Sequence, residues 1–146
     1  MSVADDMTEQ AKVTTDGPMQ LTPRSDYAAG ACNIGPAEIA ARRRFGHLGL
    51  AVTVAFAAFV LAIDAPLWLR LLVFFPAAGA ATGYLQAALH FCAGFALRGV
   101  YNFGRLGQSA AVESDAARAA DRRRAAEVFG LSVLVGVVAA GLLALL

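Results

Sequence analysis

Charged residues are missing from three long stretches of this 146-residue chain, and their absence argues against a soluble fold. The stretches cover residues 45–63, 71–97 and 128–146, and none contains Asp, Glu, Lys or Arg. A helix needs about 20 mostly apolar residues to cross a bilayer, and hydrophobic residues make up 58% of this chain. A soluble protein of this size lacks the polar surface to cover three such helices. We therefore predict an all-α membrane protein with three transmembrane helices in contact with the lipid bilayer.

Other absences narrow the classes of function. The net charge is only +1, which gives no reason to expect nucleic acid as a partner. The apolar stretches carry no carboxylate, whereas transporters and pumps place ionisable groups inside the membrane. No catalytic triad, phosphate loop or metal motif is present. We expect no enzyme activity, no cofactor and no metal site.

The first residues also lack an apolar segment. Residues 1–30 carry five acids against two basic residues and are rich in Thr, Gly and Pro. Without an apolar core region they do not resemble a cleavable signal peptide. Such a composition cannot bury enough apolar surface to offset the entropy of ordering. We predict a disordered acidic tail over residues 1–31, followed by one membrane domain over residues 32–146.

Turn and helix-start residues open the membrane domain. The sequence Cys-Asn-Ile-Gly-Pro ends at Pro36, and proline suits the first position of a helix. One helix is expected over 36–63, with 45–63 as its membrane span. Asp64 and Pro66 then provide a cap and a start for a second helix.

Hairpin register sets the second span. With a turn near residue 65, Phe45 lies level with Leu85, so the second span is 67–85 and Pro76 is expected to kink it. Residues 86–97 then continue as helix on the cytoplasmic side beside residues 33–44, with Cys92 level with about Glu38. The fold class is therefore a three-helix membrane protein whose long helical hairpin extends into the cytoplasm.

The last part of the chain completes the topology. Residues 99–109 contain three glycines and predict a loop, residues 110–127 predict a cytoplasmic helix, and 128–146 is the third span. Eleven of the twelve Lys and Arg residues would lie on one side, with Arg70 alone on the other. The positive-inside rule places the N-terminus in the cytoplasm and the C-terminus outside. The bias toward Ala, Arg and Gly suggests a bacterial inner-membrane protein.

Small residues recur on the predicted helices. Gly79 and Gly83 form a GxxxG pattern, which allows close approach of another helix, and Gly136 offers similar spacing in the last span. Packing among the three helices of one chain would explain them. This is the preferred explanation, and a homo-oligomer or a larger membrane complex is the alternative.

Four residues are candidates for chemistry. Cys32 and Cys92 would both face the cytoplasm. They could form a redox pair or a soft-metal or haem site, one of them could carry a lipid, or both could be inert packing residues. Gln86 and His90 share one small and polar helix stripe, where a buried hydrogen bond would account for both. On a helix His90 and Cys92 point about 200° apart, which argues against a shared metal ion. No metal ligand set is predicted.

Several short motifs resemble an uncharacterised family of small bacterial membrane proteins. They are Asn33 to Glu38 (Asn-Ile-Gly-Pro-x-Glu), the arginine run with Phe45-Gly46, and Gln86 with Cys92 and Arg98-Gly99. The resemblance spans about residues 32–100 and implies a membrane class without an assigned activity. We expect a non-enzymatic accessory or scaffold subunit that acts through helix packing. The alternative is a cytoplasmic-face thiol redox sensor, or a soft-metal or haem carrier, using Cys32 and Cys92.

Overall fold

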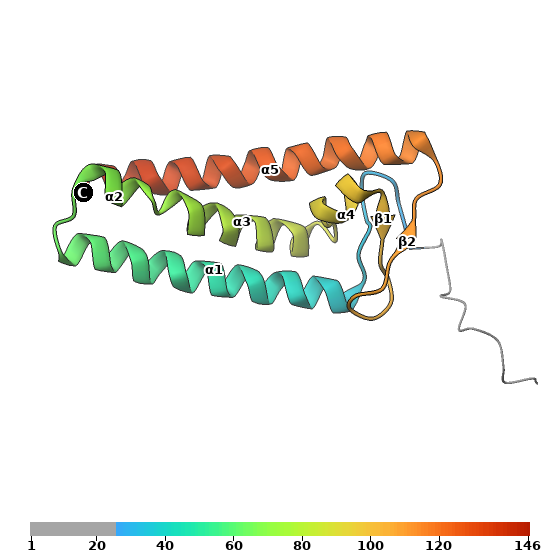
Figure 1. Cartoon of the computed structure of the whole chain (residues 1–146), viewed down its shortest axis with the longest axis horizontal. Helices are drawn as coiled ribbons and strands as arrows, with labels where there is room; N and C mark the ends of the chain where they lie inside the picture. Colours follow the sequence, from blue (N-terminus) through green and yellow to red (C-terminus); the bar gives the residue numbers. More distant parts are fainter. Residues whose placement is uncertain (1–25) are drawn as a thin grey trace, which may run out of the picture.

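A computed structural model describes residues 26–146, which form three long helical columns with a small head at one end (Figure 1). The head consists of residues 26–35 and 89–114. We call the opposite end of the columns the far end. The elements in chain order are α1 (Pro36–Ala62), α2 (Leu67–Leu71), α3 (Phe74–Ala88), α4 (Ala93–Arg98), β1 (Val100–Tyr101), β2 (Ala110–Ala111) and α5 (Asp115–Ala144).

Three segments of the described chain are long and apolar enough to cross a membrane. They are Pro36–Ala62, Leu67–Ala88 and Asp115–Ala144. The expected multi-pass membrane protein is confirmed at this level. α1 agrees with the prediction of 36–63 to within one residue, and Pro36 occupies its start.

The second column is interrupted where the sequence suggested only a kink. α2 ends at Leu71 and α3 begins at Phe74, and Val73 between them donates to the carbonyl of Arg70 in a tightened turn. Pro76 in the first turn of α3 has no N–H to donate back to residue 72. The regular hydrogen-bond ladder is therefore lost just before it, and two short helices replace one.

The second column also ends earlier than predicted. α3 stops at Ala88, and His90 adopts a left-handed backbone with φ of +52°. The helical continuation over 86–97 is therefore wrong, because residues 89–92 form a non-helical linker before α4. The left-handed turn at His90 redirects the chain, and Cys92 hydrogen-bonds to Asn33 instead of lying level with Glu38.

α3 lies between α1 and α5 in the bundle (Figure 1). On the α1 side a Cβ at Gly83 would lie 2.6 Å from the nitrogen of Gly46. On the α5 side a Cβ at Gly136 would lie 2.8 Å from the ring of Phe74. Glycines therefore bring both neighbours against the central helix. The buried cluster at the far end contains Val60, Ala65, Val73, Ala140 and Leu143.

The head closes around a short strand pair. β1 and β2 are antiparallel, with Val100 opposite Ala111 and Tyr101 opposite Ala110. The loop predicted over 99–109 is thus the inside of a small hairpin. α5 starts at Asp115 and not at 110, since residues 110 and 111 are used in the strand and Ser114 caps the helix by accepting a hydrogen bond from the nitrogen of Ala117 at 3.3 Å.

Candidate functional site

Two buried asparagines, Asn33 and Asn102, lie in the head, and Asn33 ties three segments together. The Asn33 amide donates to the carbonyl of Cys92 at 3.0 Å and accepts from the nitrogen of Cys92 at 2.6 Å. Its backbone nitrogen donates to the carbonyl of His90, and its carbonyl accepts from the nitrogen of Asn102. Asn33 is completely buried. This two-way amide clamp holds the linker before α4 and the strand β1 against the start of α1.

The two residues after Asn33 fill space between the same segments. Ile34 is fully buried against Cys92 and Phe95. At Gly35 a Cβ would lie 2.8 Å from the Cα of Phe103, so only glycine fits without displacing backbone. The Asn-Ile-Gly-Pro motif therefore has a structural reason at each of its positions.

Glu38 ends the motif as a buried carboxylate with two partners. Its oxygens accept hydrogen bonds from the side-chain amide of Asn102 at 3.2 Å and from the guanidinium of Arg42 at 3.4 Å. The amide of Asn102 also donates to the carbonyl of Arg105. The Arg42 guanidinium carbon lies 5.9 Å from the centre of the Phe95 ring, a cation–π distance. This carboxylate holds the β1–β2 loop against α1.

A second buried carboxylate, Asp121 of α5, anchors the start of the described chain. It accepts from the hydroxyl of Tyr27 at 2.8 Å and from the nitrogen of Gly30 at 2.7 Å. The Tyr27 ring stacks on Tyr101 with centroids 5.0 Å apart. Burial raises the pKa of Tyr27, and the hydrogen bond to Asp121 raises it further. The hydroxyl therefore stays protonated and remains a donor.

The ordered position of residues 26–31 differs from one sequence expectation. Residues 26–31 were assigned to the disordered tail, but here they hydrogen-bond to α5 and to Cys32. A pattern read locally could not find the distant carboxylate that orders them. The rest of the predicted tail, residues 1–25, lies outside the described residues.

The two cysteines come close in the fold but are poorly suited to thiol chemistry. Both are free, and Cys32 precedes the Asn33 that clamps Cys92. Cys92 is 2% exposed. Burial raises the pKa of the Cys32 thiol, and the charge of Asp26 adds to the increase. Because the thiolate is the nucleophile, these surroundings oppose reactivity, and the redox pair remains a prediction.

The polar stripe of Gln86 and His90 does not form the expected pair. No hydrogen bond joins these two side chains in the described part of the chain. The side-chain oxygen of Gln86 is buried without a hydrogen-bond partner among residues 26–146, whereas His90 is exposed. The left-handed turn at His90 takes it off the helix face that carries Gln86. The separation of about 200° expected on a helix therefore does not apply to His90 and Cys92.

The three glycines proposed for helix contact divide into two groups. Gly83 packs on α1, and Gly136 packs on the Phe74 ring of α3. Both contacts lie within one chain. At Gly79 a Cβ would meet nothing within 4 Å, so only this glycine leaves open space for a neighbouring molecule.

Basic side chains surround the head. Arg43 and Arg44 on α1 and Arg122 and Arg123 on α5 are exposed. They occupy the head-proximal turns of their helices (Figure 1). These are the cationic clusters that the sequence placed on one side of the membrane.

The polar side chains of this site therefore serve mainly as structural hydrogen-bonding groups. In residues 26–146 no three His, Cys, Asp or Glu side chains gather in a set that could hold a metal ion. Sequence analysis missed Asn102, Tyr27 and Asp121 as parts of this network. One signal was present, since Asn33 and Asn102 are the only two asparagines in the chain.

Comparisons with protein-family models, with curated proteins and with solved structures found no match for this chain.

Proposed function

We propose that this chain is a non-enzymatic accessory or scaffold subunit of a bacterial inner membrane, with its N-terminus in the cytoplasm and its C-terminus outside. The exposed arginines around the head favour a cytoplasmic head by the positive-inside rule. The buried carboxylates Glu38 and Asp121 both accept hydrogen bonds that hold the head together. Their oxygens are thus engaged in structural hydrogen bonds.

One observation carries the proposal. In the 18-residue apolar segment of α1 that could span the membrane, only 11% of the residues are buried by the rest of the chain. Along this helix Leu50, Val54 and Leu61 share one face at steps of four and seven residues, and all three are exposed. A helix that gives so little of its surface to its own chain is available for lipid or for a partner helix. Membrane helices associate by close packing of such faces.

The test uses the full chain in its native membrane. After extraction in mild detergent, we expect native electrophoresis to show an assembly larger than one chain with a fixed composition. Val54→Trp adds bulk on the exposed face of α1 and should release the chain from that assembly. Val138→Trp is the matched control, because Val138 is a similarly exposed valine on α5.

Two results would overturn the proposal. One is a chain that migrates alone under all mild extraction conditions. The other is an assembly that both tryptophan variants weaken equally, because the loss would then not depend on α1. An assembly made only of copies of this chain would support the scaffold form of the proposal.

A further inference from the structure

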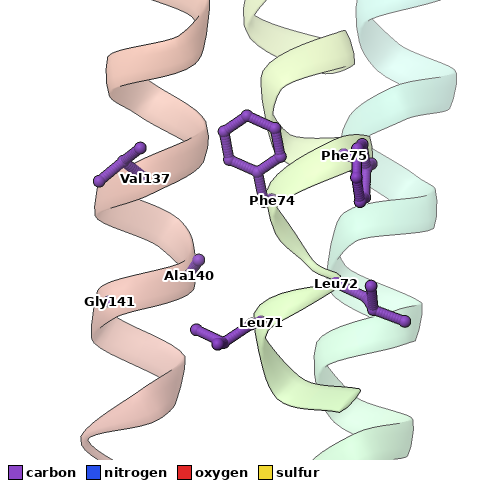
Figure 2. Close-up of a pocket in the computed structure, with 7 residues that line it drawn as sticks. All are labelled: Leu71, Leu72, Phe74, Phe75, Val137, Ala140 and Gly141. Atoms are coloured by element: carbon purple, nitrogen blue, oxygen red, sulfur yellow. The ribbon is translucent and has the colours of Figure 1, made fainter. Parts of the chain in front are cut away.

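A groove of about 500 Å³ opens between α5 and the junction of α2 with α3 (Figure 2). Its lining is entirely apolar and consists of Leu71, Leu72, Phe74, Phe75, Val137, Ala140 and Gly141. This volume lies within the range of about 300–1,000 Å³ that is usual for small-molecule sites. The groove is separate from the head and from the polar network described above.

The groove exists because small residues face a broken helix. At Gly141 a Cβ would meet nothing within 4 Å, and Ala140 adds only a methyl group. The interruption between α2 and α3 removes a regular turn from the facing side. Figure 2 shows Leu71 and Phe74 on either side of this interruption, both facing α5.

The depth of the groove matches the upper part of a lipid chain. Leu71 lies four residues after the start of α2, and Gly141 lies three residues before the end of α5. At 1.5 Å per residue, these two residues lie about 5 Å below the far end. The deepest residues of the lining lie about 12 Å below it. This interval belongs to the hydrocarbon next to the headgroups in a core about 30 Å thick.

Two charged residues lie at the same end of the bundle as the groove, one in α2 and one in the turn before it. Asp64 and Arg70 are the only Asp, Glu, Lys or Arg residues between Arg44 and Arg98. Arg70 is held by the carbonyl of Ala65 at 2.7 Å and by the carboxylate of Asp64 at 2.7 Å. Arg70 immediately precedes Leu71 in the chain, and its side chain is 15% exposed. The side chain of Asp64, in the turn, is 96% exposed. A positive residue therefore directly precedes the groove lining in the chain, and its guanidinium binds the turn that carries the more exposed negative charge.

We propose that the groove binds one acyl chain of a zwitterionic phospholipid, with its phosphate at Arg70 and its ammonium group at Asp64. In such a lipid the phosphate lies nearer the acyl chains and the ammonium group lies farther out. The sequence of charges on the protein is the complement of this arrangement. Guanidinium groups bind phosphate well, and Asp64 would repel a headgroup that carries only negative charge. The inference depends on the membrane-spanning fold and is independent of the accessory function.

The sole tryptophan of the chain provides a local reporter. Trp68 is 65% exposed and stands one turn before Leu71 on α2. The full chain is reconstituted into vesicles of phosphatidylethanolamine and phosphatidylglycerol in equal amounts. Bromine, which quenches tryptophan fluorescence on contact, is placed on the acyl chains of one lipid at a time. We expect brominated phosphatidylethanolamine to quench Trp68 more than brominated phosphatidylglycerol does.

Variants separate the groove from lipid that merely surrounds the helices. Gly141→Leu fills the groove from a position with open space, so the fold is retained and the excess quenching is lost. Gly130→Leu is the matched control on α5, because Gly130 also has nothing within 4 Å and lies outside the groove. It should keep the excess. Asp64→Asn should remove the preference for phosphatidylethanolamine while quenching by bound acyl chains persists.

The contrary results are equally definite. Equal quenching by both brominated lipids in the unmodified chain would mean surrounding lipid only and would overturn the proposal. So would an excess that survives Gly141→Leu. A preference for phosphatidylglycerol would show that Asp64 does not oppose an anionic headgroup and would refute the assigned charge pairing.

Discussion

The amide clamp of Asn33 gives the sharpest test of how the head is held together. Asn33→Ala removes both hydrogen bonds to the backbone of Cys92. The buried nitrogen of Cys92 then has no acceptor, which costs about 1–3 kcal/mol. The carbonyl of Cys92 keeps its bond from Ala96, so the loss there is about 0.5–1.5 kcal/mol. Opening of the head should become easier by about 1.5–4.5 kcal/mol in total.

Labelling of Cys92 by a maleimide measures this opening directly. Cys92 is 2% exposed and must become accessible before it reacts. In a Cys32→Ser background, the purified chain in detergent should label at a rate proportional to the open population. With about 1.4 kcal/mol for each factor of ten, Asn33→Ala should speed labelling roughly 10- to 2,000-fold.

An exposed amide in the same head provides the control. Gln108 accepts one hydrogen bond from the nitrogen of Arg105 at 3.1 Å, at the surface. Gln108→Ala should change the labelling rate of Cys92 by less than about tenfold, because water replaces this bond. An unchanged rate in Asn33→Ala would refute the clamp. Equal acceleration in both variants would show that any loosened loop exposes Cys92.

Three further predictions concern packing, pH and topology. Gly83→Ala should destabilise the chain toward denaturation in detergent, since its Cβ would meet backbone atoms of α1; Gly79→Ala should be neutral or stabilise by up to about 1 kcal/mol through helix propensity, and equal effects would contradict the close approach. The raised pKa of Tyr27 means that above a pH of about 10 the unfolded chain loses this proton first, so the free energy of unfolding falls with rising pH, and Tyr27→Phe should reduce that slope. A denaturant titration at several pH values, compared with the unmodified chain, measures the slope, and an identical slope in both proteins would count against the buried hydroxyl. Reporter fusions after Gln108 should report the cytoplasm and those after Leu146 the outside; both on one side would contradict the proposed orientation.

The three long helical segments of the bundle were predictable because the pattern that indicates them extends over many residues. The absence of charge over about 20 residues does not depend on tertiary contacts. For this reason α1 was found to within one residue, and Pro36 marked its start. Pro76 likewise indicated a disturbance in the second column, although the break falls before it, between Leu71 and Phe74.

The end of α3 could not be predicted, because residues 89–97 are compatible with a helix by composition. The decisive contact comes from a residue far away in sequence. Asn33 hydrogen-bonds the backbone of Cys92 and leaves His90 in a left-handed conformation. Tertiary hydrogen bonds of this kind outweigh the small differences in helix propensity. The same reason explains the early order at Tyr27, which depends on Asp121 94 residues away.

Rotation about a helix axis also escaped the sequence pattern. Gly79 and Gly83 look equivalent as a GxxxG pair, yet a Cβ at Gly83 would clash with α1, whereas one at Gly79 would meet nothing within 4 Å. Four residues along a helix differ by about 40° in direction. That difference separates a residue at the centre of a contact from one at its edge. A pattern of small residues therefore indicates that close packing occurs without identifying which glycine provides it.

The apolar surplus after residue 85 has a different meaning once the head is known. The sequence predicts extra helix there, but Phe91, Ala93 and Ala96 are buried against α5. These residues form the core of the head, and the Asn-Ile-Gly-Pro motif closes over that core. Both conspicuous sequence features are thus used in folding. Among the described residues, the uncovered face of α1 and the groove at the far end remain available for recognition, and we propose that Arg70 and Asp64 orient the lipid bound at the groove.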